Sequence, residues 1–191
     1  VSQKLIMSNE NDVNYNYIIN KILSNIVSDE IDKMLAEAFE CVEAENYSDA
    51  LKLYNSVLKK DHNNINALVD KGATLQNMGR LKLAIRSYDK ALAISPDNLD
   101  ALLNKGSTLH SDQKYQKAIS CYDEALRIDK KCAMALAYKG LSLGEMGKLQ
   151  DAIKHFKKAL SIDNHYDLAS ISKEVAQELL KSINANKIKT Q

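Results

Sequence analysis

The sequence repeats itself at a fixed interval of 34 residues. Three segments, Asp70–Leu75, Asn104–Leu109 and Tyr138–Leu143, align without gaps, and each has a glycine at its third position. A more divergent copy lies one interval upstream. A period of this length is typical of a stack of repeated units, because one such unit cannot bury its apolar face alone. The residues that recur are Gly72, Gly106 and Gly140; Ala84, Ala118 and Ala152; Tyr88, Tyr122 and Phe156; Ala91, Ala125 and Ala159; Ile94, Ile128 and Ile162; and, in the divergent copy, Ala38, Ala50, Tyr54 and Val57.

Each copy contains two helical patterns separated by a break. Apolar residues fall at helical rather than strand spacing on both sides of Gly79. We expect Gly79 and Gly147 to turn the chain with a positive φ angle, and Pro96 to end a helix. Small residues such as Gly72 and Ala84 would let the two helices of a copy approach closely, and the recurring aromatic residue would fill the space beside them.

These residues resemble the consensus of the tetratricopeptide repeat. Its positions are matched by Leu68, Gly72, Leu75, Ala84, Tyr88, Ala91 and Pro96, with leucine in place of the leading tryptophan, and the match runs from Ile31 to about Asn164. The resemblance implies an all-α fold, a right-handed superhelical α-solenoid of helix-turn-helix units. We expect four units, at residues 31–64, 65–98, 99–132 and 133–166.

Two further segments flank the predicted units. Residues 167–184 are expected to form a C-terminal capping helix whose apolar stripe covers the last unit, followed by a flexible tail at 185–191. The stripe consists of Leu168, Ile171, Val175, Leu179 and Ile183. Residues 1–30 are expected to hold a flexible start and an extra Ile-rich helix capped by Asp12. That helix could cap the first unit, dock into the groove of the array or join two copies of the chain.

Composition narrows the function classes. The formal net charge is +1 and the charges are interleaved, so we expect no nucleic-acid partner. No apolar run reaches the length of a membrane span, and no signal peptide is recognisable, so we expect no membrane contact and a cytoplasmic location. Cys41, Cys121 and Cys132 lie at scattered spacings and are expected to be free thiols. The first residue is not Met, so the chain is trimmed, a fragment or carries an added remnant, and a repeat portion of a longer enzyme stays open.

No residue pattern indicates catalysis, a metal site or a cofactor. The four histidines are separated and have no nucleophile at a catalytic spacing. The glycines follow the repeat rather than a phosphate-binding loop. We therefore expect a non-catalytic protein without cofactors.

The resemblance implies that the first helices of successive units line a concave groove that binds a peptide or a partner helix. The residues carried over to that groove include acids and amides but no lysine or arginine, so we expect a neutral or basic ligand with a few apolar anchors. The acidic tail of heat-shock chaperones is disfavoured, because Val69, Ala73, Met134 and Tyr138 replace the side chains that clamp it. The alternative is a structural homo-oligomerisation unit in which the N-terminal helix mediates assembly or occludes the groove. The expected groove residues are Phe39, Asn66, Asp70, Asn77, Asp100, Leu103, Asn104, His110, Met134, Tyr138 and Leu141.

Overall fold

The computed structural model describes residues 2–189, with side chains described for residue 17 and residues 19–182. This part of the chain forms nine helices and contains no strand, which confirms the predicted all-α class. By its internal contacts the chain divides into two bodies, an N-terminal body of residues 1–67 and a C-terminal body of residues 68–191. The helices are α1 (Ser2–Glu43), α2 (Tyr47–Lys60), α3 (Ile65–Asn77), α4 (Leu81–Ile94), α5 (Leu99–Ser111), α6 (Tyr115–Ile128), α7 (Ala133–Glu145), α8 (Leu149–Ile162) and α9 (Asp167–Lys189).

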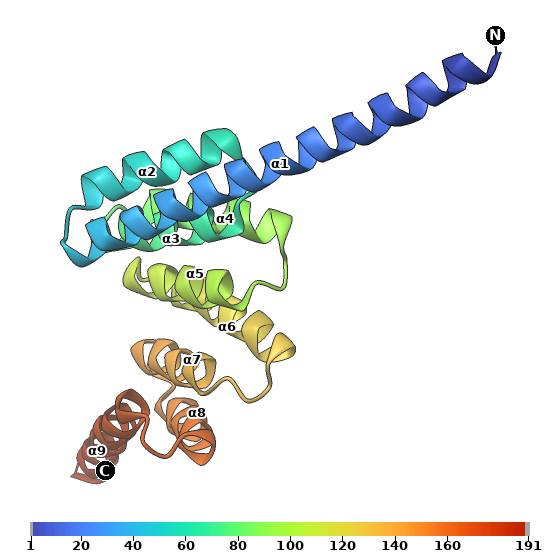
Figure 1. Ribbon diagram of the computed structural model, residues 1–191. Helices are drawn as coiled ribbons and strands as arrows, with labels where there is room; N and C mark the ends of the chain where they lie inside the picture. The colour runs from blue at the N-terminus through green and yellow to red at the C-terminus, as the bar shows by residue number, and fades with distance from the viewer. Residues whose placement is uncertain (1, 190–191) are drawn as a thin grey trace. The chain divides into compact units, whose positions relative to one another are not determined.

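The N-terminal body is built from α1 and α2, and the first helix is far longer than a repeat helix. The expected extra helix and the first helix of the first repeat unit are one continuous helix, and Asp12 lies inside it rather than at its start. The physical reason is that residues 1–43 contain neither Gly nor Pro, so nothing interrupts the backbone hydrogen bonds. Only the C-terminal part of α1 packs on α2, where Ile31, Ala38 and Tyr54 are buried. The rest of α1 extends beyond α2 (Figure 1).

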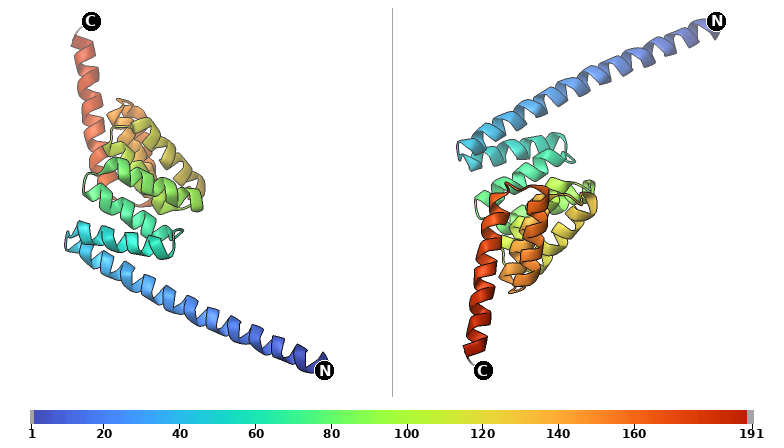
Figure 2. Two further views of the ribbon diagram at one scale, coloured as in Figure 1. Left: turned by 90° about the horizontal axis from the view of Figure 1, so that it is seen from above. Right: turned by 90° about the horizontal axis from the view of Figure 1, so that it is seen from below.

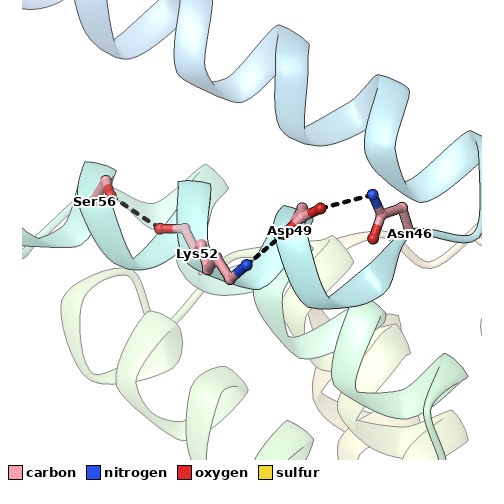
Figure 3. Close-up of polar contacts among 4 residues, drawn as sticks. All are labelled: Asn46, Asp49, Lys52 and Ser56. Atoms are coloured by element: carbon pink, nitrogen blue, oxygen red, sulfur yellow. Dashed lines mark hydrogen bonds and ion pairs between the residues drawn. The ribbon is translucent and has the colours of Figure 1, made fainter.

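Local side-chain contacts organise the start of α2. Asp49 accepts hydrogen bonds from the Asn46 amide (2.8 Å) and the Lys52 ammonium (2.6 Å), and the Ser56 hydroxyl donates to the Lys52 carbonyl (Figure 3). The Asp49 carboxylate lies in the first turn, near the positive end of the helix dipole, where a negative charge is stabilising. These contacts are exposed, so they help to define where the helix begins but add little to stability.

The C-terminal body is a stack of paired helices. The first helix of each pair, α3, α5 and α7, lies in one layer, and the second, α4, α6 and α8, lies in another (Figure 1). The last helix, α9, packs on α7 and α8 and reaches past their ends (Figure 2). Residues 185–189, which we expected to belong to a flexible tail, continue α9. The division into four repeat units stays a prediction.

Close contact between a glycine and an aromatic ring joins the two helices of each pair. A Cβ atom built on Gly72, Gly106 or Gly140 would lie 2.5–2.6 Å from a ring atom of Tyr88, Tyr122 or Phe156 respectively. These rings are 0–2% exposed. The expectation that a small residue and an aromatic residue fit together is therefore confirmed.

The turns within the helix pairs recur at the same interval and share a left-handed backbone conformation. Gly79 and Gly147 have φ angles of +70° and +74°, as the sequence analysis predicted. The equivalent positions in the other two pairs carry Glu45 (φ +56°) and Gln113 (φ +57°). A residue with a Cβ atom is strained in this conformation by roughly 1–2 kcal/mol.

The helices α3, α5 and α7, the first helices of their pairs, each begin with a side-chain cap. The sequence analysis did not identify this cap. The side chains of Asn64 and Asn98 accept hydrogen bonds from the backbone N–H three residues later, at 2.9 and 2.8 Å. The Cys132 sulfur takes the same role for α7, at 3.4 Å from the Ala135 nitrogen. Such caps satisfy backbone donors that the first helical turn leaves unpaired.

Candidate peptide-binding groove

The candidate site is the face of α3, α5 and α7 that is turned away from α4, α6 and α8, which we call the inner face (Figure 1). Nine of the eleven expected groove residues belong to the C-terminal body, on these three helices. The other two, Phe39 and Asn66, belong to the N-terminal body, where both are exposed and Phe39 is 62% exposed.

Two acids on neighbouring helices of the inner face repel each other. The pKa of Asp70 is raised above its ordinary value, first by burial and second by the negative charge of Asp100. Both residues are nevertheless open to water. The surrounding protein therefore partly desolvates the Asp70 carboxylate although the residue reaches solvent.

The lysines of α5 and α7 are directed toward the other layer. Lys105 of α5 pairs with Asp89 of α4 at 2.6 Å, and Lys139 of α7 pairs with Asp123 of α6 at 2.5 Å. The lysine side chains in these pairs are only 25% and 19% exposed. In the part of the chain that the structure describes, no ion pair joins Asp70 to a cation. The inner face therefore keeps its negative charges uncompensated.

A polar contact links α3 to α5. The Gln76 side-chain oxygen accepts from the Thr108 hydroxyl at 2.6 Å, and the Gln76 amide nitrogen donates to Ser107 at 3.4 Å. The Thr108 hydroxyl also lies 2.8 Å from the Asn104 carbonyl and has one hydrogen to share between the two acceptors. Thr108 is fully buried, so this contact fills the space between the helices and satisfies its own polar atoms.

An equivalent contact links α5 to α7 one repeat later. His110 Nδ1 lies 2.9 Å from the Ser142 hydroxyl, and the His110 ring meets the edge of Tyr115 with 5.2 Å between centroids. Burial lowers the pKa of His110, and the nearby charge of Glu145 opposes that shift. The structure thus places His110 between helices as a packing residue with a polar partner, rather than on the open surface of the groove.

The apolar residues expected to anchor a ligand differ in how much surface they offer. Met134 is 45% exposed, whereas Leu103 is 7% exposed and belongs to the core. Tyr138 is half-buried and stacks on Tyr122 with 6.0 Å between ring centroids. Leu141 is half-buried and faces a cavity at the C-terminal end of the inner face. Leu103 therefore packs in the core rather than offering surface to a ligand.

The capping helix does not use the apolar stripe that the sequence suggested. The residues of α9 buried against the preceding helices are Ala169 and Ala176. Ile171, Val175 and Leu179 are 62%, 59% and 49% exposed, and Ile183 lies outside the described side chains. The repeat interval could have predicted that these residues lie on the inner face, since Val175 follows the inner-face residue Leu141 by 34 residues.

The described residues contain no cluster of three or more His, Cys, Asp and Glu side chains arranged to hold a metal ion. Within the same part of the chain, none of the helices combines the length and the apolar character needed to span a membrane.

Comparison with known proteins supports the same architecture. A crystal structure of MamA is 25% identical, with a TM-score of 0.71, over 83% of this chain and 86% of that chain. PilF of Pseudomonas aeruginosa is 20% identical, with a TM-score of 0.74, over 82% and 71%. The first TPR of Spaghetti (RPAP3), solved with the HSP90 peptide SRMEEVD, is 21% identical, with a TM-score of 0.59, over 61% and 93%. The last two show the fold alone.

The comparison with curated protein sequences gives no match. The family model of the tetratricopeptide repeat matches residues 64–131 and 97–165, which together span more than half of the sequence. The matched residues include the three glycine–aromatic contacts and the helices α3 to α8. The chain belongs to the tetratricopeptide repeat family.

Proposed function

We propose that this chain is a non-catalytic scaffold whose C-terminal body binds a basic segment of another protein on its inner face. The observation that carries the proposal is the uncompensated negative charge of Asp70 and Asp100 on adjacent helices. A lysine or arginine placed between them would relieve their repulsion and form charge-assisted hydrogen bonds.

The family supports the general part of the proposal, since tetratricopeptide repeats are protein-interaction modules. The ligand class follows from this chain's own residues. The RPAP3 relative was solved with a peptide that carries two glutamates and a C-terminal aspartate. On the inner face of this chain the positions that would need cations carry Val69, Met134 and Tyr138. An acidic peptide would therefore meet like charge and no cationic partner.

The test is a binding measurement by fluorescence anisotropy on the full chain. The probe is a labelled peptide of lysine and leucine in scrambled order, compared with a peptide in which glutamate replaces every lysine. We expect the lysine peptide alone to bind, and we expect the double variant Asp70→Asn/Asp100→Asn to weaken binding and its salt dependence. Asp151→Asn on α8, away from the inner face, is the matched control. Equal binding of both peptides, or no effect of the double variant, would contradict the proposal.

A second candidate function rests on α1. Six large apolar side chains of its described N-terminal part are 41–65% exposed: Tyr17, Ile19, Ile22, Leu23, Ile26 and Val27. Five of them, all but Tyr17, fall on one side of the helix, and an exposed apolar stripe of this kind favours association with another helix. The alternative is therefore a homo-oligomer assembled through α1. Light scattering on the full chain and on the variant Ile22→Ser/Ile26→Ser tests it, because loss of oligomers in the variant is the expected result and monomers in both would refute it.

A further inference from the structure

The C-terminal end of the inner face contains an apolar cavity that the sequence analysis did not anticipate. It lies between α7 and α9, has a volume of about 400 Å³ and is open to solvent. Leu141 lines it from α7, and Ile171, Val175 and Leu179 line it from α9. Glu145 is the charged residue in its wall.

The cavity exists because a recurring contact between neighbouring helices is missing there. Gln76 meets Thr108 between α3 and α5, and His110 meets Ser142 between α5 and α7. One interval later the corresponding residues are Gly144 and Ala176, which are too small to fill the space. A Cβ atom built on Gly144 would meet only the Cβ of Ala152, at 3.9 Å.

The apolar side of α9 is not the side that a further repeat would cover. The α9 positions that correspond to the buried residues Leu136, Gly140 and Leu143 of α7 are polar. They carry Ser170, Glu174 and Gln177. A polar outer face is typical of the end of a repeat array. The exposed apolar residues of α9 therefore face the groove. Apolar residues on that side are not required to end the repeat array.

We propose that this cavity is the docking site for the apolar face of an amphipathic helix of a partner protein, with lysine or arginine beside its apolar residues. The proposal rests on the function proposed above and names the partner segment. Ile171, Val175 and Leu179 are spaced by four residues and span about 12 Å along α9, which matches two turns of a docked helix with anchors at the same spacing.

The charges around the cavity favour a partner helix with positively charged side chains. Glu145 stands at the wall of the cavity, and the negative charges of Asp70 and Asp100 lie on the helices that continue the inner face. A helix that placed apolar residues in the cavity would bring a flanking side chain next to Glu145. A basic residue in that position gains attraction, and an acidic one meets repulsion.

The experiment compares two peptides of identical composition on the full chain. The first is a fluorescein-labelled peptide of leucine and lysine, about 14 residues or four turns long, with its leucines on one helical face. The second is the scrambled peptide used above. We expect the amphipathic peptide to bind at least about tenfold more tightly, because only it can place several leucines in the cavity together.

Two variants address the cavity. Ile171→Ser/Val175→Ser removes exposed anchors, and Gly144→Gln/Ala176→Thr fills the cavity by copying the Gln76–Thr108 pair. Both should remove the tenfold preference for the amphipathic peptide and leave binding of the scrambled peptide unchanged. Leu83→Ser, an exposed leucine of α4 (43% exposed), is the matched control and should change neither.

The outcomes separate this proposal from the function it rests on. If both peptides bind equally, and only Asp70→Asn/Asp100→Asn weakens them, the cavity is not a docking site and the proposed function stands. Loss of all peptide binding in the wild-type chain overturns both. If the occupant is instead a second copy of the chain, light scattering will show oligomers that Ile171→Ser/Val175→Ser and Ile22→Ser/Ile26→Ser each abolish, and that result overturns the partner assignment.

Discussion

Replacing one glycine of α7 by alanine tests whether the glycine–aromatic contact holds the helix pairs together. In Gly140→Ala the new Cβ would lie 2.6 Å from Cε1 and 2.8 Å from Cδ1 of Phe156. Ordinary van der Waals contact begins at 3.4 Å, so the ring or the helix must move by about 0.8 Å. Phe156 is 2% exposed and also lines the cavity between α7 and α9, so a shift of the ring toward that space would lower the cost.

The magnitude follows from two opposing effects. Forcing an extra methyl group into a packed contact costs roughly 1–3 kcal/mol. Alanine is better than glycine in a helix by about 0.8–1 kcal/mol, which offsets part of that cost. Gly144 lies one turn further along the same helix, and a Cβ there meets only Ala152 at 3.9 Å. Gly144→Ala therefore keeps the helix gain without the clash, and the two variants should differ by about 1–3 kcal/mol.

The assay is urea denaturation followed by circular dichroism, with the free energy of unfolding taken from the midpoint and slope. We expect Gly144→Ala to unfold at a higher urea concentration than Gly140→Ala. In a Phe156→Leu background, where the ring is gone, the difference between the two alanine variants should shrink. If Gly140→Ala is as stable as Gly144→Ala in the wild-type background, the close contact does not stabilise the pair and the reasoning is refuted.

Three further predictions concern single residues. The pKa of Asp70 is raised above 3.8 in the folded chain, so ionisation of this carboxyl opposes folding. Asp70→Asn should therefore stabilise the fold at pH 7, and the gain should fade as the pH falls through the folded pKa to about 3.8. Denaturation at several pH values measures this gain. Gln113→Gly should stabilise the fold by up to about 1 kcal/mol by relieving the strain at φ +57°, and thermal melting that shows a loss would contradict this. Burial raises the pKa of the Cys121 thiol, so a thiol reagent should modify the half-buried Cys41 in the native state well before Cys121, whereas equal rates would mean that α6 opens readily.

Much of the fold was predictable because the same residue pattern occurs in several copies of the repeat. A glycine and an aromatic residue that recur together at one interval indicate a contact, and Gly72 with Tyr88 is the first of three such contacts. The turns at Gly79 and Gly147 were predictable for the same reason, since only a left-handed turn explains their recurrence. The charge of the candidate groove also followed from the sequence, because the inner-face positions of the repeat could be counted.

Other features depended on which surface each side chain meets. The sequence contained no breaker before Glu43, but the pattern of the repeat suggested a boundary near Ile31 that the continuous α1 does not have. Lys105 and Lys139 sit on inner-layer helices, and only the structure shows that they turn to acids of the other layer. Leu103 was expected at the surface and is buried, because it belongs to a core cluster that includes Tyr122 of α6 and Ala135 of α7.

The sequence by itself determined the all-α class and the 34-residue repeat of paired helices, because hydrophobic periodicity and recurring residues can be counted along the chain. The tertiary structure decided what each helix face meets. The sequence shows that Ile171 and Val175 lie on one side of α9. Only the positions of the neighbouring helices show whether that side is buried or exposed. Ala176 turns toward the core and the stripe toward the groove, and the cavity between α7 and α9 arises where Gly144 and Ala176 leave the space between two helices unfilled.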